Sequence, residues 1–165
     1  MTIKLEKALH STYSTQVNLM SPLKDKVLQF SKLILKDCIE YEFSPHITIL
    51  YGIKNLNSRD KIEYSTFSGM LGQIKKFSQP DKDVIYVEVF SEELKNKHFE
   101  IKDTVAVDLT YPKYTPHLTL GYCKKYSNDN LLNSDAFYGE RFFDLPILFC
   151  GKNEKKWLLE NKEIN

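Results

Sequence analysis

This chain of 165 residues has neither a long apolar segment nor a leader-like beginning. No apolar run approaches the roughly 20 residues that cross a bilayer. Residues 1–10 lack the apolar core of a signal peptide, so an export signal is not expected. These absences favour a soluble protein in the cytoplasm, with no membrane partner.

The sequence also lacks concentrated charge and a paired-cysteine framework. Its formal net charge is +1, and lysine and arginine are spread along the chain, so long nucleic acid is not indicated as a partner. A small anionic ligand stays open. The three cysteines, Cys38, Cys123 and Cys150, have no C-x-x-C spacing, and an odd number fits poorly with a disulfide scaffold. We expect reduced thiols in the core of a cytosolic protein.

Apolar and aromatic side chains, in contrast, are abundant enough for a packed core. Hydrophobic residues make up 42% of the chain and aromatic residues 13%. Disordered chains lack such a share of apolar and aromatic side chains. The length is that of one ordinary domain. We therefore expect a single domain over residues 1–165, and a monomer.

Hydrophobic periodicity predicts a mixed order of strands and helices. In the first half, the predicted elements are a strand over 11–19, a helix from its cap Ser21 to about 37 with Leu33 and Ile34 buried, and a strand over 43–53. A helix capped by Ser58 follows, which buries Ile62, Phe67, Met70 and Leu71. The second half is predicted to contain a strand over 84–90, a helix from its cap Ser91 to about 102, a strand over 114–123, and a hairpin of strands over 141–150 and 155–160. The strand, helix and strand of 11–53 are repeated in 84–123. This repetition predicts an α+β fold with antiparallel-leaning sheets in two pseudo-symmetric lobes.

Both repeated strands contain the same pattern, Pro-His-apolar-Thr-apolar. The two copies are Pro45-His46-Ile47-Thr48-Ile49 and Pro116-His117-Leu118-Thr119-Leu120. Alternate side chains of a strand share a face, so each strand presents His and Thr on one face and apolar residues on the other. By the same alternation Tyr51 and Tyr122 lie opposite the histidines, and we expect them to pack in the core.

The paired His and Thr side chains suit phosphodiester chemistry without a metal. One group must take a proton from the nucleophile and another must give one to the leaving oxygen, and His46 and His117 can do either near neutral pH. The hydroxyls of Thr48 and Thr119 can donate to the phosphate oxygens, where negative charge must be stabilised.

Other interpretations of these residues were weighed. Either motif alone is better explained as an ordinary strand, because threonine is common in strands. From average residue usage, roughly one histidine in a few thousand stands in such a pentapeptide, whereas two of four do here. A zinc site would need three or four ligands, and neither motif has a carboxylate or thiolate at metal-ligand spacing. We expect no metal and no other cofactor, and we place His10 and His98 at the surface.

The paired motifs, with their continuations Leu50-Tyr51-Gly52 and Gly121-Tyr122, resemble the two-histidine (2H) phosphoesterase superfamily. This superfamily includes LigT-like 2′-5′ RNA ligases and cyclic phosphodiesterases. The likeness covers about 11–160, and 84–124 is especially similar to phage-encoded and bacterial members. The resemblance implies a bilobal fold with sheets flanking a central cleft and helices outside, and a metal-independent reaction.

The resemblance also implies a site and a substrate class. The catalytic residues would be His46, Thr48, His117 and Thr119, with His117 as the base and His46 as the acid in hydrolysis, although the motifs alone leave these roles open. The substrate would be a small nucleotide with a 2′,3′-cyclic phosphate, a 2′-5′ linkage as in 2′-5′ oligoadenylate, or a cyclic oligonucleotide bond.

Four further residues are candidate substrate contacts. Tyr13 could stack on a base or bind phosphate, or pack in the core. Lys54 and Lys124 follow the two motif strands and could attract an anion, or remain solvated. Trp157 could lean over the cleft from the C-terminal hairpin, or pack against it.

The leading functional hypothesis is an enzyme that opens or cleaves a small RNA-like phosphodiester. A setting consistent with the resemblance to phage-encoded members is the destruction of a nucleotide immune signal in the host cytoplasm, which would evade anti-phage defence. Two alternatives are a non-catalytic module that sequesters the nucleotide and a ligase that processes RNA or tRNA fragments. The modest charge argues against the ligase, because holding a tRNA usually requires a basic surface.

Overall fold

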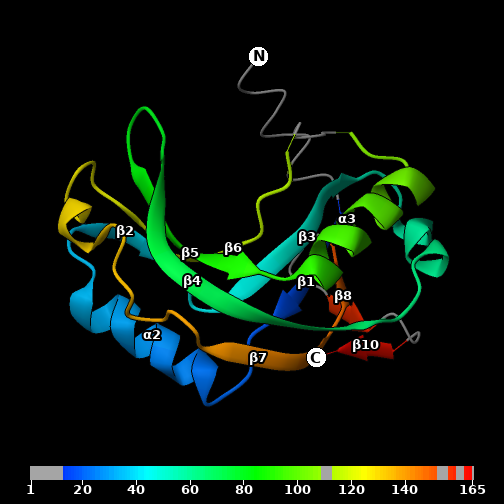
Figure 1. Ribbon diagram of the computed structural model, residues 1–165. Coiled ribbons are helices and arrows are strands. Elements are labelled where there is room, and N and C mark those ends of the chain that lie inside the picture. The colour runs from blue at the N-terminus through cyan, green and yellow to red at the C-terminus, as the bar shows by residue number, and fades with distance from the viewer. Residues whose placement is uncertain (1–12, 109–112, 152–155, 159–161, 165) are drawn as a thin grey trace.

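The computed structural model describes residues 13–108 and 113–151, together with the backbone of 156–158 and 162–164. The elements are β1 (Tyr13–Asn18), α2 (Leu23–Ile34), β2 (Cys38–Tyr41), β3 (His46–Ile53), the 3-10 helix η1 (Leu56–Lys61), β4 (Thr66–Ser78), β5 (Asp83–Phe90), α3 (Glu92–Thr104), β6 (His117–Cys123), the 3-10 helix η2 (Asp129–Leu131), β7 (Arg141–Pro146), β8 (Leu148–Cys150), β9 (Lys156–Leu158) and β10 (Lys162–Ile164) (Figure 1). Among the described residues, no helix is long and apolar enough to cross a membrane.

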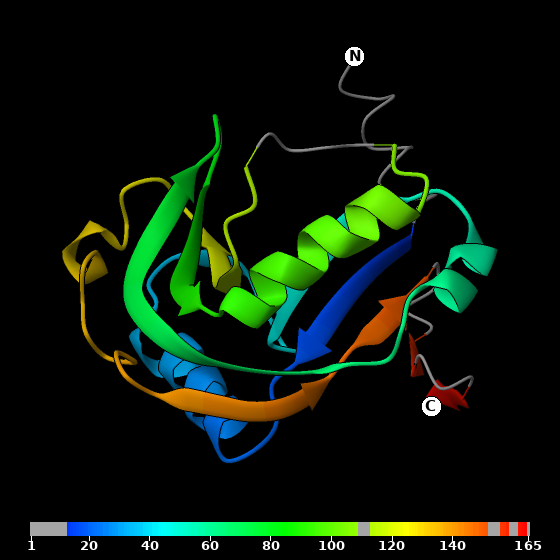
Figure 2. The same ribbon diagram turned by 45° about the vertical axis from the view of Figure 1, so that its right-hand side comes forward.

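The strands form one antiparallel sheet that curls into a half-barrel. Its order is β10-β9-β8-β1-β3-β6-β5-β4-β7, with β2 paired to β6 off this path. Figures 1 and 2 show β4 as a long, strongly curved strand, which pairs with β5 along one edge and with β7 along the other. The mixed α+β class and the antiparallel pairing are as predicted, whereas one continuous sheet replaces the separate flanking sheets. The two pseudo-symmetric lobes stay a prediction.

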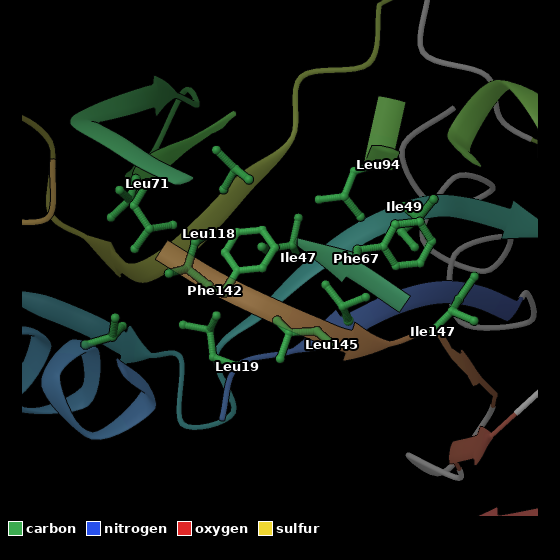
Figure 3. Packing of buried hydrophobic residues seen from close by; sticks show 14 of the residues in the cluster. Leu19, Ile47, Ile49, Phe67, Leu71, Leu94, Leu118, Phe142, Leu145 and Ile147 are labelled. Atoms are coloured by element: carbon green, nitrogen blue, oxygen red, sulfur yellow. The ribbon is translucent and has the colours of Figure 1, made fainter. Parts of the chain in front are cut away.

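The core lies where β3, β4, β6 and β7 bring their apolar side chains together, and Leu94 of α3 reaches into the same cluster (Figure 3). Ile47 and Ile49 of β3 and Leu118 and Leu120 of β6 are completely buried. Burying a side chain of this size contributes about 1.5–3 kcal/mol relative to leaving it exposed. Both motif strands are therefore held firmly from their apolar side.

The helix α3 begins as predicted. The Ser91 hydroxyl accepts a hydrogen bond from the backbone N–H of Leu94 at 3.3 Å, which satisfies one of the free donors of the first turn. Acidic Glu92 and Glu93 stand in that turn, where the helix dipole favours negative charge. The helix packs against β3 and β4.

The predicted helix after Ser58 is wrong. Only the short η1 follows, and residues 66–78 form the 13-residue strand β4. The buried residues Phe67, Leu71 and Ile74 are spaced as on a helix, because register shifts in both pairings of β4 interrupt the strand alternation. Bulges have thus produced a helix-like pattern within a strand.

The helix α2 differs from its prediction at both ends. Pro22, not Ser21, occupies the N-cap position, and no side chain caps the helix. The helix ends at Ile34, short of residue 37, and both Leu33 and Ile34 are exposed instead of buried. Leu23, Val27 and Phe30 supply its contacts with the core.

The predicted strand over 141–150 is divided into β7 and β8, which pair with different partners. β7 pairs with β4, whereas β8 pairs with β1 and β9. Pro146 is the last residue of β7 and has no N–H to donate, and the N–H of Ile147 after it bonds to the Ser65 carbonyl at 3.0 Å. The predicted C-terminal hairpin is present as β8 and β9, while β2 and β10 were not predicted.

Candidate active site

The two motif strands, β3 and β6, are antiparallel neighbours in the middle of the sheet, paired at Ile47 and Leu118. In this register the two motif histidines stand diagonally, each across from the threonine of the other strand. Because Ile47 and Leu118 point into the core, all four motif side chains lie on the opposite face.

A cavity of about 570 Å³ lies over this face, and His46, Thr48, His117 and Thr119 all line it. Its volume is in the range of small-molecule sites. The structure therefore brings together four side chains that come from motifs 71 positions apart in the sequence (117 minus 46).

Both histidines are held in the same way. His46 Nδ1 lies 2.9 Å from the Ser44 carbonyl oxygen, and His117 Nδ1 lies 2.9 Å from the Thr115 carbonyl oxygen. A carbonyl only accepts, so Nδ1 carries the hydrogen in each ring. This assignment leaves Nε2 of both imidazoles free to take or give a proton.

The surroundings of the two histidines differ. Beside His46 lies Glu42, whose Oε1 is 3.9 Å from Nδ1 and accepts a hydrogen bond from the Ser44 N–H. The ring of His117 instead meets the aromatic rings of Phe77 and Tyr86 at 5.1 Å and 5.4 Å between centroids. Burial lowers the pKa of His117, the Thr115 carbonyl partly offsets this, and nearby His46 lowers the pKa further.

Tyr51 and Tyr122 correct the prediction from strand alternation, because both line the cavity. Gln16 pairs with Thr48 and Thr15 with Leu50, so the residue between them is a bulge on β3. The pairing of β5 skips Leu120 of β6 in the same manner. Each bulge reverses the alternation and returns the tyrosine five positions after the histidine to the histidine face.

His98 corrects the prediction of a surface histidine. It is buried, its Nδ1 lies 2.6 Å from the Ile49 carbonyl oxygen, and its ring stacks on Tyr114 at 4.2 Å between centroids. Tyr114 in turn donates its hydroxyl hydrogen to the Thr48 carbonyl at 2.8 Å. Burial is the main cause that lowers the pKa of His98, with an opposing contribution from the Ile49 carbonyl. Both rings line the cavity, while His10 lies outside the described residues.

Three of the four additional predicted contacts, Tyr13, Lys54 and Lys124, lie in the described part of the chain and are not among the residues that line the cavity. Tyr13 stacks on Phe149 and packs against the core. Lys54 forms an ion pair with Asp108, and Lys124 is exposed beyond the end of β6. Trp157 belongs to β9, whose side chains lie outside the described part of the structure.

The cationic residues that do line the cavity are Lys102 and Lys113, which the sequence reasoning missed. When the alignment of the two motifs is extended at both ends, it contains a signal for Lys113. The decapeptides 42–51 and 113–122 align throughout, and Lys113 stands where the first copy has Glu42. Lys102 has no such signal, because the packing of α3 brings it to the site.

No group of three or more His, Cys, Asp or Glu side chains within the described ranges could together hold a metal ion. Metal independence remains a prediction. Cys38 and Cys123 are free thiols, Cys38 partly buried and Cys123 buried, and Cys150 is partly buried.

A comparison with family models identifies the family. The model described as anti-CBASS protein Acb1 matches residues 11–140, which includes both motif strands and the cavity. The chain belongs to the Acb1 family. A search of curated proteins finds no match. The matched region ends before β7, so the Acb1 likeness covers the two motifs and the segments that hold Lys102 and Lys113.

Proposed function

We propose that this protein is a metal-independent phosphodiesterase that opens a cyclic oligonucleotide signal by two-histidine acid-base catalysis. The observation that carries the proposal is that His46, Thr48, His117 and Thr119 line one cavity, with each imidazole held by a backbone carbonyl at Nδ1. Membership of an anti-CBASS family supports the substrate, because it suggests a phage protein that acts on cyclic nucleotide immune signals. Such a protein would act in the host cytoplasm.

The likeness of the two motifs to those of 2H phosphoesterases supports the reaction class. The two copies agree in more than sequence, since each histidine contacts the carbonyl two residues before it and each strand has its bulge at the same position. This correspondence is what two pseudo-symmetric lobes related across the cavity would produce.

The proposed hydrolysis moves two protons. Nε2 of His117 takes a proton from water as the water oxygen forms a bond to phosphorus. Nε2 of His46 gives a proton to the leaving ribose oxygen as its bond to phosphorus breaks. The hydroxyls of Thr48 and Thr119 donate to the non-bridging oxygens, where charge builds up in the transition state.

The neighbours of the histidines support this division of roles. The negative charge of Glu42 lies beside His46, where a proton donor carries its positive charge. The rings of Phe77 and Tyr86 cover part of His117, and its lowered pKa favours the neutral form, which a base needs.

Sequestration of the nucleotide without cleavage is the second candidate, because the family description fits a protein that either degrades or binds the signal. RNA ligation is less favoured. Within the described ranges, the Lys, Arg, Asp and Glu side chains that line the cavity are two lysines and one glutamate, which is not the basic surface that a tRNA needs.

A substrate panel in EDTA tests the proposal. It contains cyclic di- and trinucleotides, 2′-5′ oligoadenylate and nucleoside 2′,3′-cyclic phosphates, with products separated by chromatography. We expect cleavage of a cyclic oligonucleotide, a loss of roughly 10²- to 10⁴-fold in kcat for His46→Ala and for His117→Ala, and no loss for His10→Ala, which alters neither motif. Tight binding without product would support sequestration instead, and activity abolished by EDTA would contradict metal independence.

A further inference from the structure

Two lysine side chains, Lys102 and Lys113, line the cavity. Lys102 and Lys113 have no ion-pair partner among the described residues, unlike Lys54, which is paired with Asp108. Glu42 is the one carboxylate among the described residues that line the cavity, and it lies beside His46. The two lysines therefore bring more positive charge to the cavity than the single carboxylate of Glu42 can neutralise.

The stacked pair of His98 and Tyr114 lines the same cavity as the two lysines. Lys102 stands four residues after His98 on α3, so the two share a face of the helix. Lys113 directly precedes Tyr114 in the chain. Because His98 and Tyr114 stack face to face and each is bonded to a backbone carbonyl of β3, the two segments that supply Lys102 and Lys113 meet beside this pair.

On the proposed mechanism, the two imidazoles and two hydroxyls of the motifs all act on the scissile phosphate. The histidines serve its nucleophile and leaving oxygen, and the threonines serve its non-bridging oxygens. A pair of ammonium groups without partners suits a further anion, because lysine binds phosphate as a mobile point charge with three donors. We infer that Lys102 and Lys113 form a second phosphate subsite, which holds the non-scissile phosphate of a cyclic oligonucleotide while the histidines act on the other. This inference rests on the proposed function for the scissile site.

The subsite predicts selectivity for ligands with two phosphates. The probes are three 3′,3′-cyclic dinucleotides (cyclic di-AMP, cyclic di-GMP and cyclic GMP-AMP) and adenosine 2′,3′-cyclic monophosphate. Their dissociation constants are measured by calorimetry in a His117→Ala background, which is not expected to consume them. Variants are Lys102→Gln, Lys113→Gln and the double change, with Lys124→Gln as an exposed control outside the cavity.

We expect each single change to weaken the best-bound cyclic dinucleotide about three- to tenfold, and the double change to weaken it more than tenfold. In the same variants, the dissociation constant of the monophosphate should change less than twofold. Lys124→Gln should affect the binding of neither ligand. Lys102→Arg, which keeps the positive charge, should retain most of the cyclic dinucleotide affinity that Lys102→Gln loses. An equal loss for both ligand types, or no loss for either, would overturn the subsite. So would a wild-type protein that binds no cyclic dinucleotide more tightly than the monophosphate.

Turnover by the unaltered protein separates this inference from the proposed function. Selective loss of dinucleotide binding in a protein that cleaves nothing would retain the subsite and refute the enzyme. Robust cleavage that is unchanged in the lysine variants would support the enzyme and refute the subsite.

Discussion

Replacing the motif threonines by valine tests the role of the hydroxyls most directly. Thr48→Val and Thr119→Val keep the branched shape that suits a strand and remove only the donor. Both side chains are half-buried at the cavity, and neither hydroxyl has a hydrogen-bond partner among the described residues. Since no partner is left unsatisfied, we expect the free energy of unfolding to change by less than about 1 kcal/mol.

The catalytic effect of the same changes should be much larger. A hydrogen bond to a charged group contributes about 1.5–3 kcal/mol, so each substitution should lower kcat about tenfold to 150-fold. The loss should fall on kcat more than on KM, because the charge on the phosphate oxygens increases in the transition state.

The assay compares steady-state kinetics with thermal unfolding for each variant. Thr66→Val, at an exposed strand position of β4, is the matched control and should leave kcat unchanged. Thr48→Ser and Thr119→Ser keep a hydroxyl and should recover most of the activity. If valine at both motif positions left kcat within twofold of the wild type while folding was intact, the hydroxyls would have no part in catalysis.

Three other perturbations have definite expected outcomes. On a substrate with a nitrophenolate leaving group, which needs no proton, His46→Ala should lose far less activity than His117→Ala, measured as kcat/KM. On the proposed mechanism neutral His117 is the active form, and its pKa is lowered mainly by burial, so kcat/KM should persist at pH values below the ordinary histidine range. Phe77→Ala, which hydrates that ring, should move the acidic limb to higher pH. Gly69→Ala should cost about 1–3 kcal/mol in chemical denaturation, since the new Cβ would lie 2.5 Å from Cζ of buried Phe142.

Each of these has a contrary result. Equal losses for both histidine variants on the activated substrate would contradict the division into acid and base. An acidic limb that stays in place in Phe77→Ala would mean that His117 does not set it. Gly139→Ala is the control for the glycine change, because a Cβ there meets nothing within 4 Å and only its positive φ is strained. Unchanged stability in Gly69→Ala would show that Phe142 moves aside freely.

The sequence predicted what depends on local periodicity. The His-x-Thr faces of β3 and β6 could be read from alternation, because no bulge intervenes between histidine and threonine in either strand. The same rule failed three residues after each threonine, at Tyr51 and Tyr122, where one extra residue reverses the faces. It failed again in β4, where register shifts space Phe67 and Leu71 like helix positions.

Long-range packing accounts for the rest of the site. His98 has ordinary helical neighbours in the sequence, and only the contacts of α3 with β3 turn its ring toward Ile49 and Tyr114. Lys102 reaches the cavity for the same reason. Lys54 and Lys124 looked suitable because they follow the motif strands, yet neither lines the cavity. Position along a strand therefore predicted which motif side chains line the cavity, but not the other residues that form its walls.

The charge difference between Glu42 and Lys113 gives the duplicated site a direction. Two identical motifs would present the same acid-base pair to a substrate in either orientation. Here the position four residues before each histidine is negative in one copy and positive in the other, and both side chains line the cavity. On the proposed mechanism the negative copy stands beside the proton donor, and the positive copy attracts the second phosphate. One substitution between the repeats would thus fix both which histidine protonates the leaving group and how a cyclic oligonucleotide lies across them.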